Sequence, residues 1–123
     1  MKILITGGTG YIGSHAAVVL ANAGHDLVLL DNLSNSSRTV LARLEAITSS
    51  PLVFVEGDVR DSALLDILFA EHRFDAVLHF AGLKAVGESV EKPLLYYQNN
   101  VCGSLNLLMA MQQHGVKKMV FSS

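Results

Sequence analysis

Five short apolar segments alternate with longer segments of helical period, and this alternation constrains the fold more than any other feature. The apolar segments are nearly continuous in Val, Leu, Ile and Phe, which is typical of parallel strands covered on both faces. The expected strands are Lys2–Thr6, Asp26–Asp31, Leu52–Glu56, Asp75–Phe80 and Lys118–Ser122. The expected helices are Tyr11–Ala23, Arg38–Ile47, Ser62–Glu71 and Pro93–His114. The pattern predicts an α/β fold whose doubly wound parallel sheet has the strand order 3-2-1-4-5.

Residues at the helix ends support these boundaries. Gly24 and Gly115 follow apolar stretches, where a left-handed residue commonly closes a helix. Asp61 is placed to cap the helix after the third strand, and Pro93 suits a first helical turn.

Composition narrows the class of protein. Residues 1–123 are 50% hydrophobic and are expected to form one domain. Nine basic and eleven acidic side chains give a net charge of −2, which favours neither nucleic acid nor an anionic membrane. A single cysteine, Cys102, cannot form an internal disulfide. We find neither a signal peptide nor an apolar run of the ~18–20 residues that span a bilayer, so we expect a cytoplasmic protein.

A glycine-rich segment joins the first strand to the first helix. Gly7, Gly10 and Gly13 are spaced three residues apart. A turn without Cβ atoms lets backbone N–H groups approach a pyrophosphate, which then faces the positive end of the helix. A turn without any ligand is the alternative, but the position between a strand and a helix favours a dinucleotide. A Walker-type loop is excluded because no Lys precedes Ser14.

Acidic residues follow the second and third strands. Asp31 lies 18 residues past Gly13, where a carboxylate can accept hydrogen bonds from both adenosine ribose hydroxyls. It would repel a 2′-phosphate, and no Arg or Lys lies nearer along the chain than Arg38, which favours NAD over NADP. Asp58 either reaches the adenine amino group or serves as an ordinary turn residue, and the sequence leaves both readings open.

Other polar residues are less specific. The five histidines show no convincing metal-ligand spacing, and His79, in a buried strand, is expected to be a hydrogen-bonded core residue. Lys84 follows the fourth strand and either contacts cofactor hydroxyls or lies in a solvated loop. Asn99 falls inside an expected helix, where its poor propensity indicates a polar task. Cys102 is expected in the core.

The last expected helix carries apolar residues on more than one face. Its two stripes are Val101, Leu105 and Leu108, and Leu107 and Met111. One face can cover the sheet, whereas the other requires a partner.

Several runs resemble the UDP-glucose 4-epimerases, which are extended short-chain dehydrogenase/reductases. The runs are TGGTGYIGSH (Thr6–His15), LDNLSNS (Leu30–Ser36), VEGDVRD (Val55–Asp61), HFAGLKAVGESVEKP (His79–Pro93), YYQNNVCGSLNLL (Tyr96–Leu108) and VFSS (Val120–Ser123). Many extended reductases share the glycine loop, whereas the run from His79 is far more specific to the 4-epimerases. The resemblance covers the whole chain and implies a Rossmann-type domain that binds NAD.

The resemblance also implies which residues bind the cofactor. Tyr11 and Ile12 would contact the pyrophosphate, residues 31–36 the adenosine ribose, residues 58–59 the adenine, and residues 80–84 the nicotinamide side. The full set is Gly7, Gly10, Tyr11, Ile12, Gly13, Asp31, Asn32, Leu33, Ser34, Asn35, Ser36, Asp58, Val59, Phe80, Ala81, Gly82, Leu83, Lys84, Asn99 and Ser122.

The reaction implied by the resemblance is interconversion of the C4 epimers of a UDP-hexose, through a transient 4-keto sugar, in galactose metabolism. The family's Tyr-x-x-x-Lys pair would come after Ser123, and Tyr11, Tyr96 and Tyr97 have no Lys four places on. We therefore expect a cofactor cradle without catalytic residues, metal or UDP-sugar domain, inactive alone, and dimeric through the helix near residues 93–114. The alternatives are the front half of a sugar-nucleotide 4,6-dehydratase or decarboxylase, which the segment Lys84–Val90 disfavours, and a non-catalytic NAD-binding module.

Overall fold

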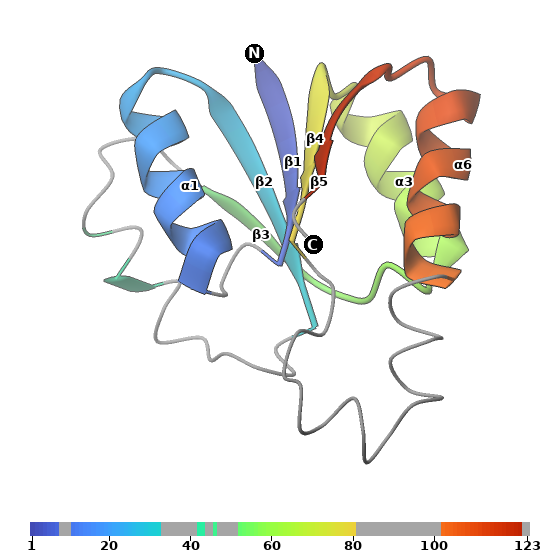
Figure 1. Ribbon diagram of the computed structural model, residues 1–123, viewed down its shortest axis with the longest axis horizontal. Coiled ribbons are helices and arrows are strands. Elements are labelled where there is room, and N and C mark those ends of the chain that lie inside the picture. The colour runs from blue at the N-terminus through green and yellow to red at the C-terminus, as the bar shows by residue number, and fades with distance from the viewer. Residues whose placement is uncertain (8–10, 33–41, 44–45, 47–51, 81–101, 122–123) are drawn as a thin grey trace.

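The computed structural model describes residues 1–7, 11–32, 42–43, 46, 52–80 and 102–121, which form a parallel sheet flanked by helices (Figure 1). The strands are β1 (Lys2–Thr6), β2 (Asp26–Asp31), β3 (Val53–Glu56), β4 (Ala76–His79) and β5 (Lys118–Phe121). They are parallel and lie in the order β3-β2-β1-β4-β5, which confirms the predicted topology. The switch point lies between β1 and β4, on either side of which the chain winds in opposite directions.

Helices cover both faces of the sheet, with α1 (Tyr11–Asn22) on one face and α3 (Ser62–His72) and α6 (Gly103–Gln113) on the other (Figure 1). Successive side chains of a strand point to opposite faces. Ile3 and Ile5 of β1 accordingly pack with α1, whereas Leu4 packs with α3 and α6. Both faces of the sheet are therefore buried in hydrophobic core, which explains why the strands are apolar at nearly every position.

The helix ends follow the local signals in the sequence. The Asp61 carboxylate accepts a hydrogen bond from the Leu64 N–H at 3.1 Å and caps α3. Gly24 and Gly115 have φ values of 92° and 72°, the left-handed conformation expected of residues that close helices. The helix α3 ends at His72, one residue later than predicted. The next residue, Arg73, adopts the left-handed conformation with φ 47° although it is not glycine.

The last helix confirms one expectation and corrects another. Leu107 and Met111 are buried, whereas Leu105 and Leu108 are 54% and 48% exposed, so the two predicted stripes do face opposite sides. Cys102 is exposed, and its prediction as a core residue was wrong. It precedes the first residue of α6, and the next residue, Gly103, takes the buried position against the loop after β3.

Some expectations fall where the structure describes little. Within the helix expected over Arg38–Ile47, the described residues Ala42, Arg43 and Ala46 are helical. Pro93, Val101 and the first part of the expected 93–114 helix lie outside the described residues. None of the helices in the described ranges has both the length and the apolar composition needed to cross a bilayer.

Candidate cofactor site

The carboxyl ends of the central strands meet at one edge of the sheet, where backbone hydrogen bonds join them. The Gly7 N–H donates to the Leu30 carbonyl at 2.7 Å, and the Phe80 N–H donates to the Thr6 carbonyl at 2.9 Å. Gly7 has φ 71°, a conformation that favours glycine, so the chain turns away from β1 at a residue without a side chain. The predicted glycine turn after the first strand is confirmed at this position.

The N-terminus of α1 lies at the same edge (Figure 1). The helix begins at Tyr11, and Gly13 in its first turn is buried. The first N–H groups of a helix have no partner within the helix and carry partial positive charge. This edge therefore presents donors that suit an anionic group such as a pyrophosphate.

Asp31 is the last residue of β2, beside the glycine turn. The residue is only 8% exposed, whereas Asn32, which follows it, is exposed. A carboxylate at the end of the strand next to β1 is the arrangement that the sequence predicted for binding the ribose hydroxyls.

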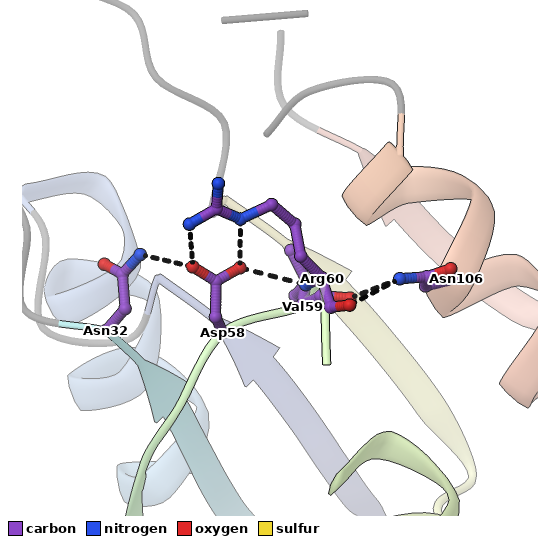
Figure 2. A network of polar contacts seen from close by, with 5 residues as sticks. All are labelled: Asn32, Asp58, Val59, Arg60 and Asn106. Atoms are coloured by element: carbon purple, nitrogen blue, oxygen red, sulfur yellow. Dashed lines mark hydrogen bonds and ion pairs between the residues drawn. The ribbon is translucent and has the colours of Figure 1, made fainter. Parts of the chain in front are cut away.

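Asp58, in the loop after β3, is the centre of a polar network (Figure 2). Its Oδ1 accepts hydrogen bonds from the backbone N–H of Arg60 at 2.9 Å and from Arg60 Nε at 3.1 Å. Its Oδ2 accepts from Arg60 Nη2 at 2.7 Å and from Asn32 Nδ2 at 3.0 Å. The Asn32 contact joins the ends of β2 and β3, while the bond to the Arg60 N–H is the one that an ordinary turn aspartate makes.

The network keeps Asp58 ionised. Burial by itself raises the pKa of the carboxyl group, but the hydrogen bonds and positive charge of Arg60, with the Asn32 amide, outweigh burial and lower the pKa to about 2. The hydrogen bond from Arg60 to Asp58 correspondingly raises the pKa of the guanidinium. Asp58 and Arg60 are therefore a charged pair at every pH of biological interest.

His79, the last residue of β4, contacts both β1 and α6 through its imidazole ring. It is 1% exposed, its Nδ1 lies 2.5 Å from Thr6 Oγ1, and its Nε2 lies 3.2 Å from Ser104 Oγ. The Thr6 hydroxyl also accepts a hydrogen bond from the Phe80 N–H at 3.1 Å. The prediction of a hydrogen-bonded core histidine is confirmed, and both ring nitrogens are engaged by protein groups.

The profile of the NAD dependent epimerase/dehydratase family matches residues 3–123. The chain belongs to this family. A UDP-glucose 4-epimerase of Bacillus subtilis is 57% identical over 123 residues, which are the whole of this chain and 36% of that protein. A UDP-glucose 4-epimerase of Klebsiella pneumoniae is 54% identical over 123 residues, and the match covers 88% of it. The chain thus spans about a third of the length of the Bacillus relative and most of the length of the Klebsiella one.

Solved structures of epimerases share this fold closely. A UDP-glucose 4-epimerase from Bifidobacterium longum, in complex with NAD+ and UDP, matches with a TM-score of 0.97 and 51% identity. One from Stenotrophomonas maltophila, with bound NAD and formylated UDP-arabinopyranose, matches with a TM-score of 0.96 and 52% identity. Each match covers 100% of this chain and 37% of the other.

The structure places the predicted site residues that it describes at one edge of the sheet, where the strands have their carboxyl ends. Gly7, Gly13, Asp31, Asn32, Asp58 and Phe80 lie at or beside the carboxyl ends of the strands, and Tyr11 and Ile12 lie in the first turn of α1. The Val59 side chain is buried in the core, so only its backbone can approach a bound base. The predictions that lie outside the described residues are Gly10, Leu33, Ser34, Asn35, Ser36, Ala81, Gly82, Leu83, Lys84, Asn99 and Ser122.

Sequence reasoning missed two members of the network, Arg60 and Asn106. Asn106 Nδ2 donates to the carbonyls of Val59 at 3.3 Å and Arg60 at 2.9 Å (Figure 2). The sequence did carry a signal for Asn106, because asparagine has poor helix propensity and Asn106, like Asn99, falls inside the expected last helix. Together with Asp58, Asp61 and Cys102, these two residues line an open pocket of about 510 Å³.

The described residues contain no group of three or more His, Cys, Asp or Glu side chains placed to hold a metal ion. Two of the acidic side chains near the edge have other partners, since Asp58 pairs with Arg60 and Asp61 caps α3.

Proposed function

We propose that the chain is the NAD-binding part of a UDP-glucose 4-epimerase that interconverts UDP-glucose and UDP-galactose. The observation that carries this proposal is the position of Asp31, a residue only 8% exposed, at the end of β2, beside the Gly7 turn and the N-terminus of α1. Relatives named UDP-glucose 4-epimerase match the whole chain, and structures of such enzymes contain NAD, which supports the same assignment.

The described residues offer a different group of donors or acceptors to each of three parts of NAD, which are the pyrophosphate, the adenosine ribose and the adenine. The N-terminus of α1 would bind the pyrophosphate, and Asp31 would accept hydrogen bonds from the ribose hydroxyls. Asp58 and the backbone of Val59 would contact the adenine. When bound, NAD supplies the acceptor and donor of the hydride that leaves and returns at C4 of the sugar.

Recognition of the adenine amino group requires an exchange at Asp58. A carboxylate offers about four acceptor positions, and four protein donors occupy them. Three of these donors belong to Arg60 and are charged or held in the turn, whereas the fourth is the neutral amide of the exposed Asn32. We infer that the amino group takes the place of the Asn32 amide, which then becomes available to the ribose.

The proposed cofactor is NAD rather than NADP. The Asp31 carboxylate would repel a 2′-phosphate by charge. Arg60 supplies a positive charge in the network of Figure 2, but two of its guanidinium nitrogens already bind Asp58. A phosphate would have to compete with a carboxylate for that guanidinium, so Arg60 does not reverse the preference.

The remaining features of the proposal concern the whole enzyme. Within these 123 residues no Tyr is followed by Lys four places on, so we assign to them cofactor binding and no acid–base step. Binding of a UDP-sugar is proposed from the names and bound ligands of the relatives. A role in galactose metabolism would follow from the proposed reaction, and the cytoplasmic location remains a proposal from the sequence.

We also propose a homodimer through α3 and α6. The two helices pack side by side on one face of the sheet. Each of them also carries exposed apolar side chains. These are Ile67, Leu105, Leu108 and Met109. Water contact with such a surface is unfavourable, and a symmetric contact with a second copy would bury it.

Titration calorimetry of nucleotide-free protein with NAD and NADP tests the cofactor assignment. We expect tighter binding of NAD, and we expect Asp31→Ala to weaken it by about 1–3 kcal/mol, the range for hydrogen bonds to a charged group. Asp26→Ala is the matched control, because Asp26 is exposed at the opposite end of β2. NADP binding as tight as NAD binding would contradict the assignment, and so would an Asp31→Ala protein with unchanged affinity.

A further inference from the structure

We infer that Asn106 of α6 is a positioning residue for the adenine end of the cofactor. Its side chain holds the loop after β3 so that Asp58 can distinguish the adenine amino group from other substituents. This inference rests on the proposed function, since it assumes that Asp58 faces the base of a bound NAD.

The Asn106 amide makes two hydrogen bonds to that loop and connects segments 46 residues apart along the chain. Its Nδ2 reaches the Val59 carbonyl at 3.3 Å and the Arg60 carbonyl at 2.9 Å. One amide group, which carries two N–H donors, therefore binds two consecutive carbonyls of the loop. Two bonds from one group restrict both the position and the tilt of this stretch of backbone.

The restriction is transmitted to Asp58 through a single peptide plane. The Val59 carbonyl and the Arg60 N–H belong to the same planar unit, so they move together. Asn106 binds the carbonyl of this unit, while its N–H donates to Asp58 Oδ1 at 2.9 Å. The Arg60 side chain then adds two further bonds to the same carboxylate (Figure 2). A tilt of this plane would therefore change three of the four hydrogen bonds that orient Asp58.

A steric contact from the same helix limits the loop from a second point. Gly103 lies three residues before Asn106 and so on the same side of α6. A Cβ built on Gly103 would lie 2.5 Å from Val59 Cγ2, so the helix backbone already approaches the loop as closely as glycine allows. The loop can neither move toward α6, because of Gly103, nor away from it without breaking the Asn106 bonds.

Two substitutions at Asn106 test the inference. Asn106→Leu removes both donors while keeping a similar size and improving helix propensity, and Asn106→Asp keeps the shape but replaces the donor with an acceptor. Gln113→Leu is the control, because it makes the same amide-to-leucine change on an exposed residue two turns along α6. The ligands are NAD and nicotinamide hypoxanthine dinucleotide, whose base carries a carbonyl oxygen where adenine has the amino group.

We expect the unsubstituted protein to bind NAD roughly 10–100-fold more tightly than the hypoxanthine dinucleotide, as one hydrogen bond to a charged acceptor allows. Both Asn106 variants should reduce this ratio to within about threefold of one, by weakening NAD more than the hypoxanthine dinucleotide, while Gln113→Leu keeps it. The ratio separates positioning from a general loss of stability, which would weaken both ligands equally.

The outcomes distinguish this inference from the proposed function. If the unsubstituted protein binds neither dinucleotide, the proposed function fails and the inference fails with it. If it binds NAD and the Asn106 variants lose affinity for both ligands equally, or keep the original ratio, the inference is overturned while NAD binding stands. The inference is also overturned if the unsubstituted protein does not discriminate between the two bases.

Discussion

The close approach of α6 to the loop after β3 makes Gly103→Ala a sensitive test of the packing described above. The new methyl group would lie 2.5 Å from Val59 Cγ2. Carbon atoms pack favourably at about 3.5–4.0 Å, so one side must shift by about 1 Å. Val59 cannot readily do so, because it is 3% exposed and its branched side chain has a stiff χ1 angle.

The magnitude follows from two opposing terms. Overpacking a core costs about 1–3 kcal/mol, whereas replacing glycine with alanine inside a helix gains up to about 1 kcal/mol. Gly103 is the first residue of α6, where the gain is smaller than in a helix interior. We therefore expect Gly103→Ala to lower the free energy of unfolding by about 1–2 kcal/mol and to weaken NAD binding, because Val59 adjoins Asp58.

Urea unfolding of the purified protein, followed by circular dichroism, measures this change as a lower midpoint with an unchanged slope. Gly57→Ala is the comparison for steric contact, because its new methyl group would come closest to the end of the flexible, half-buried Leu64 side chain, with Leu30 Cδ1 at 3.3 Å. Gly115→Ala isolates backbone strain, since φ is 72° and no atom lies within 4 Å of the added Cβ. We expect Gly57→Ala to cost less than Gly103→Ala. A Gly103→Ala protein as stable as the original would refute the reasoning.

Two further predictions concern pH. The lowered pKa of Asp58, about 2 against an ordinary 3.8, means that its contribution to stability is complete above pH 3.8 and is lost as the pH falls toward 2. Asp58→Asn should remove this acid-dependent contribution, about 1 kcal/mol after allowing for solvent around the pair, and an identical acid-unfolding curve would contradict it. Burial, with the charge of Lys2, lowers the pKa of His72 below 6.5. The Nδ1 atom of His72 is also buried without a hydrogen-bond partner among the described residues. Stability should therefore decrease as the pH falls below 6.5, and urea midpoints of His72→Gln at pH 8 and pH 5 should differ less than those of the original protein.

Features that depend on neighbouring residues were predictable from the sequence. The bounds of β1 and β2 match the prediction, because an apolar run flanked by turn residues specifies a strand buried on both faces. The Asp61 cap and the left-handed Gly115 were also predictable, since each depends on a few adjacent residues. The position of Asp31 followed from the length of a strand–helix–strand unit, which sets where the second strand ends.

Features that depend on how distant elements rotate and contact one another were not predictable from the sequence. Each helical residue turns by about 100°, so the apolar pattern alone did not show whether Cys102 or Gly103 would be buried. It showed two stripes on the last helix, but only packing against the sheet and α3 determined that Leu107 is buried and Leu108 exposed. The Asp58 network joins the end of β2, the loop after β3 and α6, and its residue types are unremarkable in each segment. Local backbone preference and burial period thus determined the elements and their order, while the tertiary contacts decided which polar side chains act together.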